Sequence, residues 1–467
     1  MAGTTNLKPA AFLSPFASPD QLDLELKSFL EEASFLLCNW LSESCQGTPL
    51  PKVGEFDDFL LSHKGLSKKE LLERLHFVMD GSYRSSHPGS LAHLDPPPLT
   101  ASIVADLISA GLNNNLLGDE LSPSLSQLER KLCKWFINQL DMPSIGGGVF
   151  ASGGSLSNLM ALVTARQHLG LGCDPSAALI ASEDSHVSLV KARKIMGLPE
   201  DAMQLVPTNE EGQISLECLH QSLKDLKLKN KKCFAIVATA GTTVRGAVDP
   251  IFELSKITAK EGLWLHVDGA IGGIFALSRN KEDIVRGISL ADSVTLNPQK
   301  ILGIAKTSSL LLVANKSSLV STFSTGLPYL EPTDGEPHGG EIGIQGTRSA
   351  EVLKLWLGLL QLGSEGIIHL LDNCIYRRKY IQGKLDSSLL DILSGDLHII
   401  AISPKNLDRN KSEAWSDRLR NDLLEKKFLV SRSIYKDRYY LKIVLGNPNT
   451  ELCHLDKLSH LINNSIK

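Results

Sequence analysis

The sequence lacks several features by which common classes of protein are recognised. No apolar run approaches the roughly 18 residues that a helix needs to cross a bilayer, and the first twenty residues show neither the basic start nor the apolar stretch of a signal peptide. Lys and Arg number 48 against 52 Asp and Glu, and neither sign forms a long run. Charge therefore gives no reason to expect nucleic acid or an anionic membrane as a partner. We expect a soluble, cytoplasmic protein.

Cysteine patterns are missing as well. The eight cysteines are scattered, and no two of them form a C-x-x-C pair, which argues against a zinc site, a dithiol redox motif and a disulfide scaffold. We therefore expect reduced thiols and no metal site. Aromatic residues make up only 6% of the 467 residues, but apolar residues make up 42% and charged residues 21%. This composition is typical of a folded globular chain.

The pattern of apolar residues divides the chain into three parts. Residues 1–85 contain two amphipathic helical patterns, over 20–43 and 67–79, and predict a helical segment whose apolar face needs a cover. Residues 86–344 predict a large α/β domain. Residues 345–467 open with a helical stripe and predict a smaller α+β domain.

Short apolar runs alternate with helical stretches through the large domain. The strand candidates are AALIAS, CFAIVATA, LWLHVDGA, SVTLN and SSLLLVAN. Runs that are apolar on both faces and alternate with helices are typical of a mostly parallel sheet covered by helices on each side. The predicted fold class is therefore α/β.

A glycine-rich turn before a helix is the first candidate for a ligand site. Gly153, Gly154 and Ser155 open an apolar helical stretch, and free N–H groups at a helix start attract anions such as phosphate. From this segment alone, an ordinary glycine-rich loop is an equally good interpretation. Neither G-x-x-x-x-G-K-[ST] nor G-x-G-x-x-G occurs, so a nucleoside triphosphate or a dinucleotide is not the expected ligand.

Three further polar residues follow strand candidates. A buried carboxylate at Asp268 needs a cation or proton donor, although it also suits the cap of a turn. An apolar setting would favour the free amine of Lys300 and make it a nucleophile, but a solvated loop lysine is the commoner case. The imidazole of His186 could stack on a planar ligand or be structural.

These positions gain meaning together. The carboxyl ends of parallel strands share one edge of a sheet, which would collect the glycine turn, His186, Asp268 and Lys300. Pyridoxal phosphate (PLP) needs this set: an anion site for its phosphate, an acid for its ring nitrogen and an amine for its aldehyde. We therefore expect PLP as the cofactor.

The same residues lie in motifs that resemble the group II PLP-dependent amino-acid decarboxylases. The similarity extends from about His87 to Pro448, through SPSLSQLE, GVFASGGSLSNLMAL, ASEDSHVSLVKA, ATAGTTVRGAVDP, LHVDGAIGG, DSVTLNPQK and GTRSAEVLKLW. The family includes decarboxylases of aromatic amino acids, glutamate, histidine and 2,4-diaminobutyrate. It implies the aspartate-aminotransferase-like fold (PLP fold type I), an amino-acid substrate and a homodimer.

The resemblance also implies roles for individual residues. Lys300 would join the PLP aldehyde, Asp268 would bind the ring nitrogen and His186 would stack on the ring. Arg348 matches a family arginine that meets the substrate carboxylate or orders the active-site loop. The remaining residues would surround the cofactor: Gly154, Ser155 and Asn297 at the phosphate, Thr243 at the ring hydroxyl, and Asp249, Ala270 and Gln299 nearby.

Two departures from the family pattern bear on the cofactor and on the substrate. Gln299 precedes Lys300 where the family usually has His, and an amide cannot carry charge at neutral pH. HPGSLAHLDPPP lacks the aromatic residues of the aromatic-specific members, so an aromatic substrate is not expected. His93 and Asp95 suggest a polar pocket, and Asp95 suits a cationic side chain such as that of 2,4-diaminobutyrate. Glutamate and aspartate stay open.

The implied reaction is loss of carbon dioxide from an amino acid held as an external aldimine, through a quinonoid intermediate. LPYLEPTDGEPHGGEIG is rich in Gly and Pro and is a candidate lid. Within it, Tyr329 or His338 could donate the proton to Cα, or each could be an exposed loop residue. The alternatives are an aminotransferase or another carbon-carbon lyase of the same fold, and a non-catalytic homologue.

Overall fold

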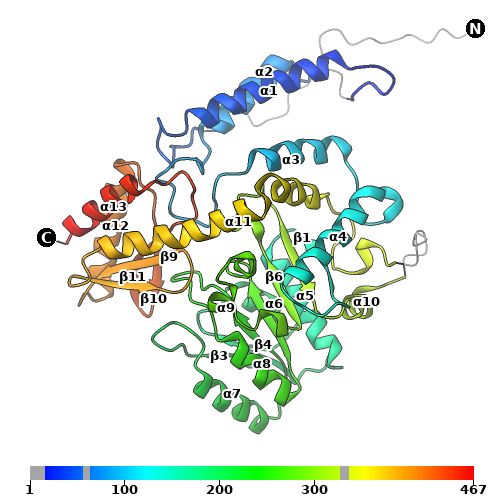
Figure 1. Cartoon of the computed structure of the whole chain (residues 1–467), viewed down its shortest axis with the longest axis vertical. Coiled ribbons are helices and arrows are strands. Elements are labelled where there is room, and N and C mark those ends of the chain that lie inside the picture. The colour runs from blue at the N-terminus through cyan, green and yellow to red at the C-terminus, as the bar shows by residue number, and fades with distance from the viewer. Residues whose placement is uncertain (1–15, 56–63, 327–335, 467) are drawn as a thin grey trace, which may run out of the picture.

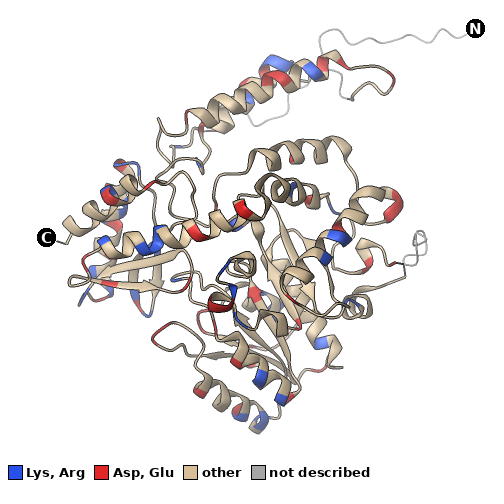
Figure 2. Cartoon of the chain, in the orientation of Figure 1, with Lys and Arg blue, Asp and Glu red and all other residues tan. Residues whose placement is uncertain are grey.

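The computed structural model describes residues 16–55, 64–326 and 336–466. Figure 1 shows a large body of helices around a central sheet, a smaller C-terminal part beside it, and two N-terminal helices along its outer edge. Within the described residues, no helix is both long and apolar enough to cross a membrane. Figure 2 shows blue and red residues interspersed over the outer helices, with neither sign gathered on one part of this view.

The central sheet has seven strands in the order β1-β7-β6-β5-β4-β2-β3. Only β7 runs against its neighbours β1 and β6, and the other pairs are parallel. All five strand candidates are confirmed, and the predicted α/β class with them. The strands are β1 (Gly147–Ala151), β2 (Ala177–Ser182), β3 (Met203–Val206), β4 (Lys232–Thr239), β5 (Trp264–Gly269), β6 (Ser293–Leu296) and β7 (Ser309–Val313).

Helices cover both faces of this sheet because its strands are apolar on both. In β2, Leu179 packs into one core with residues of α5 and α6, while its neighbour Ile180 packs into the opposite core with residues of α4, α7 and α8. This is the two-sided burial expected of a mostly parallel sheet. The helices of the large body are α3 (Thr100–Leu112), α4 (Pro123–Gln139), α5 (Gly154–His168), α6 (Ser188–Ile195), α7 (Leu216–Leu228), α8 (Ile251–Glu261), α9 (Lys281–Ile284) and α10 (Ser317–Phe323).

The C-terminal part is built on an antiparallel sheet of order β10-β11-β9-β8. The long helix α11 (Glu351–Lys384), bent at Gly363 where φ is 61°, runs from the large body to this sheet (Figure 1). Leu91, far away in sequence, bonds to the same part: its N–H donates to Leu429 O at 3.0 Å, and its carbonyl accepts from Val444 N at 2.7 Å. The other elements are β8 (Leu390–Ser394), β9 (Ile399–Pro404), β10 (Ser431–Tyr435), β11 (Arg438–Val444), α12 (Arg409–Glu425) and α13 (Leu452–Asn464).

The two N-terminal helices, α1 (Leu24–Ser42) and α2 (Lys68–Asp80), lie side by side in Figure 1. Asp23 caps α1 by accepting from Leu26 N at 2.9 Å, and Ser67 forms a capping box with Glu70 at the start of α2. Both predicted helices are confirmed. Neither contains a buried residue, so their apolar side chains are at most partly covered within the single chain.

Candidate active site

The predicted ligand residues lie where strands of the central sheet end. β1 and β6 both run against β7, so β1, β2, β4, β5 and β6 share one direction and their carboxyl ends share one edge. In open α/β sheets this edge is the usual place for a ligand. The loops that follow these strands carry Gly154, His186, Thr243, Ala270 and Lys300.

The start of α5 forms a cradle with two other loops. Gly153 has φ 147°, a conformation that glycine adopts readily, and it lets Gly154 begin the helix directly after β1. A Cβ placed on Gly154 would lie 3.1 Å from Asn297 Oδ1 and 3.4 Å from Ala270 Cβ. Three predicted cofactor residues therefore converge, and Ser155 beside them is exposed. The first N–H groups of a helix have no partner within it.

Asp268 ends β5 as a buried carboxylate, with 5% of its surface exposed. Its Oδ2 accepts from Asn158 Nδ2 at 2.8 Å and its Oδ1 from Ala270 N at 3.2 Å. It forms no ion pair within the part of the chain that the structure describes. Its charge nevertheless raises the pKa of both His186 and Lys300 against the effect of desolvation.

Lys300 closes a short 3-10 helix, Pro298–Lys300, directly after β6. Burial lowers the pKa of its ammonium, opposed by the charges of Asp268 and Asp95. A lower pKa favours the free amine, as a nucleophilic lysine requires. His186 is exposed at the sheet edge, and partial desolvation lowers its pKa, with Asp268 raising it and Lys300 lowering it further.

Two predicted residues contact the backbone of the site. Asp249 is buried, and its two oxygens accept from Thr239 N and Ile214 N, each at 2.7 Å. Burial raises its pKa to about 7 against these two bonds. Thr239 ends β4 opposite Asp268, so Asp249 supports the strand end beside that carboxylate. The side chain of Gln299 accepts from Ser308 N and ties the 3-10 helix to the start of β7.

Comparison with known proteins identifies the family. The pyridoxal-dependent decarboxylase conserved domain matches residues 64–389. An aromatic-L-amino-acid decarboxylase of Bacillus atrophaeus is 31% identical over 70% of this chain and 69% of its own, and a cysteine sulfinic acid decarboxylase of Rattus norvegicus is 30% identical over 75% and 72%. This chain belongs to the pyridoxal-dependent decarboxylase family. It is a PLP-dependent amino-acid decarboxylase, as its motifs predicted.

Solved structures confirm the fold of the decarboxylase. Mouse CSAD in its apo form superposes with a TM-score of 0.88 at 23% identity, covering 95% of this chain and 99% of the mouse chain. Oryza sativa TDC, solved with PLP and tryptamine, superposes with a TM-score of 0.89 at 19% identity, covering 97% and 99%. The expected PLP fold is therefore present over nearly the whole chain. The comparisons support decarboxylation, not the alternatives of an aminotransferase, another carbon-carbon lyase or a non-catalytic homologue.

The residues of the decarboxylase fit its cofactor. The Gly154 cradle suits a phosphate, and Asp268 is a buried acid that still lacks a cation within the described ranges. The hydroxyls of Thr239 and Thr295, on the strands either side of Asp268 and level with it, are buried without a hydrogen-bond partner there. A buried site with unused hydrogen-bonding groups is the setting that a polar ligand completes.

Arg348 and His338 lie in a second cluster. The guanidinium of Arg348 is buried and binds both oxygens of Glu129, at 2.7 and 2.8 Å. Burial lowers the pKa of Arg348, but Glu129 outweighs this and raises it. His338 is also buried, and its Nδ1 accepts from Asp119 N at 3.3 Å. Neither residue contacts Lys300 or Asp268 in the described part of the chain, and Tyr329 lies outside the described residues.

Three polar residues of the site escaped the sequence analysis: Asn158, Ser188 and His266. Asn158 lies one turn after Gly154 on the buried side of α5, and its amide bonds to Asp268. A polar residue among the apolar positions of that helix was the available signal. His266 precedes Asp268 by two residues, which puts both side chains on one face of β5.

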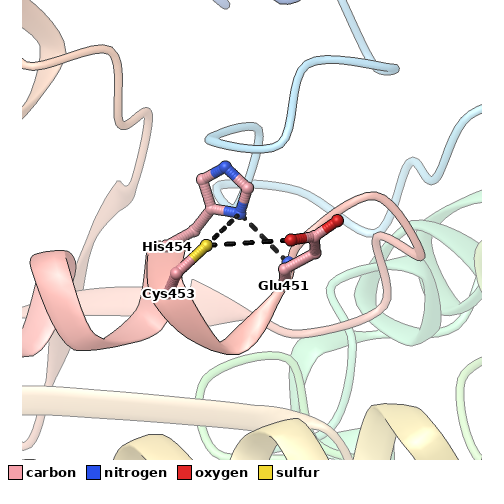
Figure 3. Close-up of side chains that lie close together, drawn as sticks. All are labelled: Glu451, Cys453 and His454. Atoms are coloured by element: carbon pink, nitrogen blue, oxygen red, sulfur yellow. Dashed lines mark hydrogen bonds between the residues drawn. The ribbon is translucent and has the colours of Figure 1, made fainter.

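Glu451, Cys453 and His454 form the one group in the described residues whose ligand atoms could surround a metal ion (Figure 3). Their contacts are those of a helix cap: Glu451 N donates to His454 Nδ1 at 3.1 Å, and the Cys453 thiol donates to Glu451 Oε2 at 3.8 Å. Glu451 and Cys453 are exposed. The cap of α13 explains the group, and we assign no metal to it.

Proposed function

We propose that Lys300 bonds to the aldehyde of PLP, that Asp268 binds the ring nitrogen, and that Gly154, Ser155 and Asn297 hold the phosphate. Bound PLP supplies an aldehyde that condenses with amines and a ring that accepts the electron pair released with carbon dioxide. The observation that carries this proposal is the cradle at Gly154, where Asn297 and Ala270 converge, at the same sheet edge as the buried carboxylate of Asp268 and the amine of Lys300.

Each side chain of the site would then have a separate role in binding the cofactor or in transferring a proton. Asp268 holds a proton at the ring nitrogen. His186, kept neutral by its lowered pKa, packs on the ring, and Thr243, Asp249, Ala270 and Gln299 complete the surround. Of the two candidate proton donors, His338 accepts at Nδ1, so its own proton is on Nε2, which is buried without a partner in the described ranges. Tyr329 is kept as the second candidate.

We propose an acidic amino acid as the substrate. Asp95, the candidate partner for a cationic side chain, is already paired with Lys306 at 2.5 Å. Lys442 of β11 is 7% exposed and forms no ion pair within the described residues. Its pKa is lowered by burial and by the charge of Lys300, against the charge of Asp95. A buried cation without a counter-ion suits a carboxylate or sulfinate.

We further propose a homodimer that works in the cytoplasm. An apolar groove of about 850 Å³ lies between α3, α4 and α11, lined by Ile108, Leu112, Leu128, Trp135, Trp356 and Leu360. Uncovered apolar surface of this kind is typical of an interface, and the partly covered apolar faces of α1 and α2 add to it. The cysteines of the described residues are free, as expected in a reducing compartment.

One experiment tests the chemistry directly. The purified protein, supplied with PLP, is reduced with borohydride, and peptide mapping locates the labelled lysine. The twenty common amino acids are then screened for carbon dioxide release. We expect the label on Lys300 and release from an acidic amino acid. A label on another lysine, or a keto acid formed without carbon dioxide, contradicts the assignment. Lys300→Arg keeps the charge and serves as the control without a label.

A further inference from the structure

A line of buried hydrogen bonds leads across three elements to Asp268. Trp264 Nε1 donates to Ser293 Oγ at 2.8 Å, and Ser293 Oγ lies 2.9 Å from His266 Nδ1. His266 Nε2 lies 3.1 Å from Asn158 Oδ1, and Asn158 Nδ2 donates to Asp268 Oδ2 at 2.8 Å. None of the five side chains is more than 5% exposed, so water does not compete for these bonds.

The chemistry of the two end groups sets the direction of every bond in this line. An indole N–H only donates, and an ionised carboxylate only accepts. At the other end, Asn158 gives its amide N–H to Asp268, so its Oδ1 accepts from His266 Nε2. Burial lowers the pKa of His266 to about 4, although Asp268 and Ser293 raise it, so the ring is neutral with its one proton on Nε2. Nδ1 of this ring is then an acceptor, and Ser293, which accepts from Trp264, donates its hydroxyl proton to it.

A second branch starts from the same amide. Asn158 Nδ2 also donates to Ser188 Oγ at 3.0 Å, and Ser188 Oγ lies 2.9 Å from His186 Nδ1. Because Ser188 N also donates to His186 Nδ1 at 3.2 Å, this nitrogen accepts and the proton of His186 is on Nε2. Asn158 thus donates one N–H directly to Asp268 and the other to Ser188, which bonds to His186.

We propose that Asn158 is a positioning residue that orients the carboxylate of Asp268 and the imidazole of His186 together, with His266 as its support. The inference rests on the proposed role of Asp268 at the ring nitrogen. Hydrogen bonds donated to a carboxylate stabilise its ionised form, and an ionised acceptor keeps the proton on the ring nitrogen. Without the Asn158 N–H, Asp268 becomes the stronger base and draws that proton towards itself.

The test measures the protonation of the PLP ring nitrogen. Wild type and Asn158→Leu, which has a similar volume and no N–H, are loaded with 15N-labelled PLP and compared by NMR. We expect the 15N resonance of N158L to move towards the unprotonated position. The matched control is Thr164→Val, which removes another buried polar group of α5, whose hydroxyl donates to Met160 O at 2.8 Å, and should leave the resonance unchanged. We also expect kcat to fall by about tenfold or more, as for a lost hydrogen bond to a charged group.

Substitutions of His266 test the direction of the line and keep the proposal testable if N158L does not fold. His266→Gln can still donate to Asn158 and accept from Ser293, whereas His266→Phe can do neither. We expect the 15N resonance to move in H266F and to stay near the wild-type position in H266Q. Equal resonances in these two variants, or a wild-type resonance in a folded N158L, overturn the inference. Borohydride labelling of Lys300 in wild type distinguishes failure of this inference from failure of the proposed function. If Lys300 is labelled but the variants do not behave as expected, only the role of Asn158 is wrong, because the label does not depend on Asn158.

Discussion

Arg348 and Glu129 form a bidentate ion pair in the interior, 219 residues apart in sequence, with each side chain only 5% exposed. The pair joins α4 to the segment just before α11. Of the two roles that the resemblance allowed for Arg348, contact with the substrate carboxylate or ordering of a loop, this geometry supports the second. Both terminal nitrogens of this guanidinium already bind Glu129, so only Nε, which has no hydrogen-bond partner within the described residues, is left for another anion.

Removal of Glu129 should destabilise the protein strongly. Glu129→Gln leaves the Arg348 cation buried with a neutral partner, and breaking a buried pair typically costs about 3–5 kcal/mol. Urea unfolding measures the loss. The control is Asp141→Asn, which breaks the exposed pair between Asp141 and Lys281 and should cost about 1 kcal/mol or less. If E129Q instead keeps wild-type stability and only raises KM, Arg348 serves the substrate and the loop role is wrong.

Lys442 provides a test of substrate class. Lys442→Met keeps the length of the side chain and removes its charge, so the KM for an acidic substrate should rise about tenfold or more, the usual scale for a lost hydrogen bond to a charged group. Lys306→Met is the matched control, because Lys306 is half exposed and already paired with Asp95, and its effect should be smaller. Steady-state kinetics with glutamate, aspartate, cysteine sulfinate and 2,4-diaminobutyrate decide the matter. Preference of the wild type for 2,4-diaminobutyrate would contradict the proposal.

The sequence predicted the centre of the fold well and its margins less well. The five central strands stand out because burial on both faces makes them continuously apolar. β1 was missed because Gly146, Gly147 and Gly148 remove that signal, and β3 because it is short and partly exposed. The helical pattern was predicted to start at residue 20, whereas α1 begins at Leu24, after the side chain of Asp23 that caps it.

The positions of some site residues could likewise be predicted from the sequence, and those of others could not. Gly154, Asp268 and Lys300 were predictable because each follows a strand or opens a helix, which is local information. The bond between Asn158 and Asp268 joins residues 110 positions apart, and no local pattern marks such a pair. Glu129 likewise gave no sign that it would neutralise Arg348. Contacts that depend on how a helix lies across a sheet appear only once the packing is known.

Asp249 should make stability depend on pH. Its pKa is raised from 3.8 to about 7 in the folded protein, so between these values the folded state holds a proton that the unfolded state has lost. Stability contributed by this group is therefore greatest below pH 3.8 and is lost as the pH rises to about 7.

Asp249→Asn removes this titration, so the slope of unfolding free energy against pH should become less negative than in wild type over that window. The variant should also be less stable by about 1–3 kcal/mol, because its amide N–H faces a backbone donor. Urea unfolding at several pH values measures both effects. The exposed Asp422→Asn is the control and should keep the wild-type slope, and an unchanged slope in D249N would show that the group does not titrate there.

The apolar groove makes a prediction about assembly. Leu360 of α11 is 59% exposed within the single chain and lines the groove together with Leu112 of α3. If a second copy covers this surface, Leu360→Glu buries an unpaired carboxylate at the interface, which is costly, and the protein should become monomeric or aggregate. Leu228→Glu is the matched control, because Leu228 is 81% exposed at the end of α7 and does not line the groove. Light scattering after size exclusion should give a dimer mass for wild type and L228E and a lower or polydisperse mass for L360E. A monomeric wild type, or a dimeric L360E, would show that this groove is not the contact between subunits.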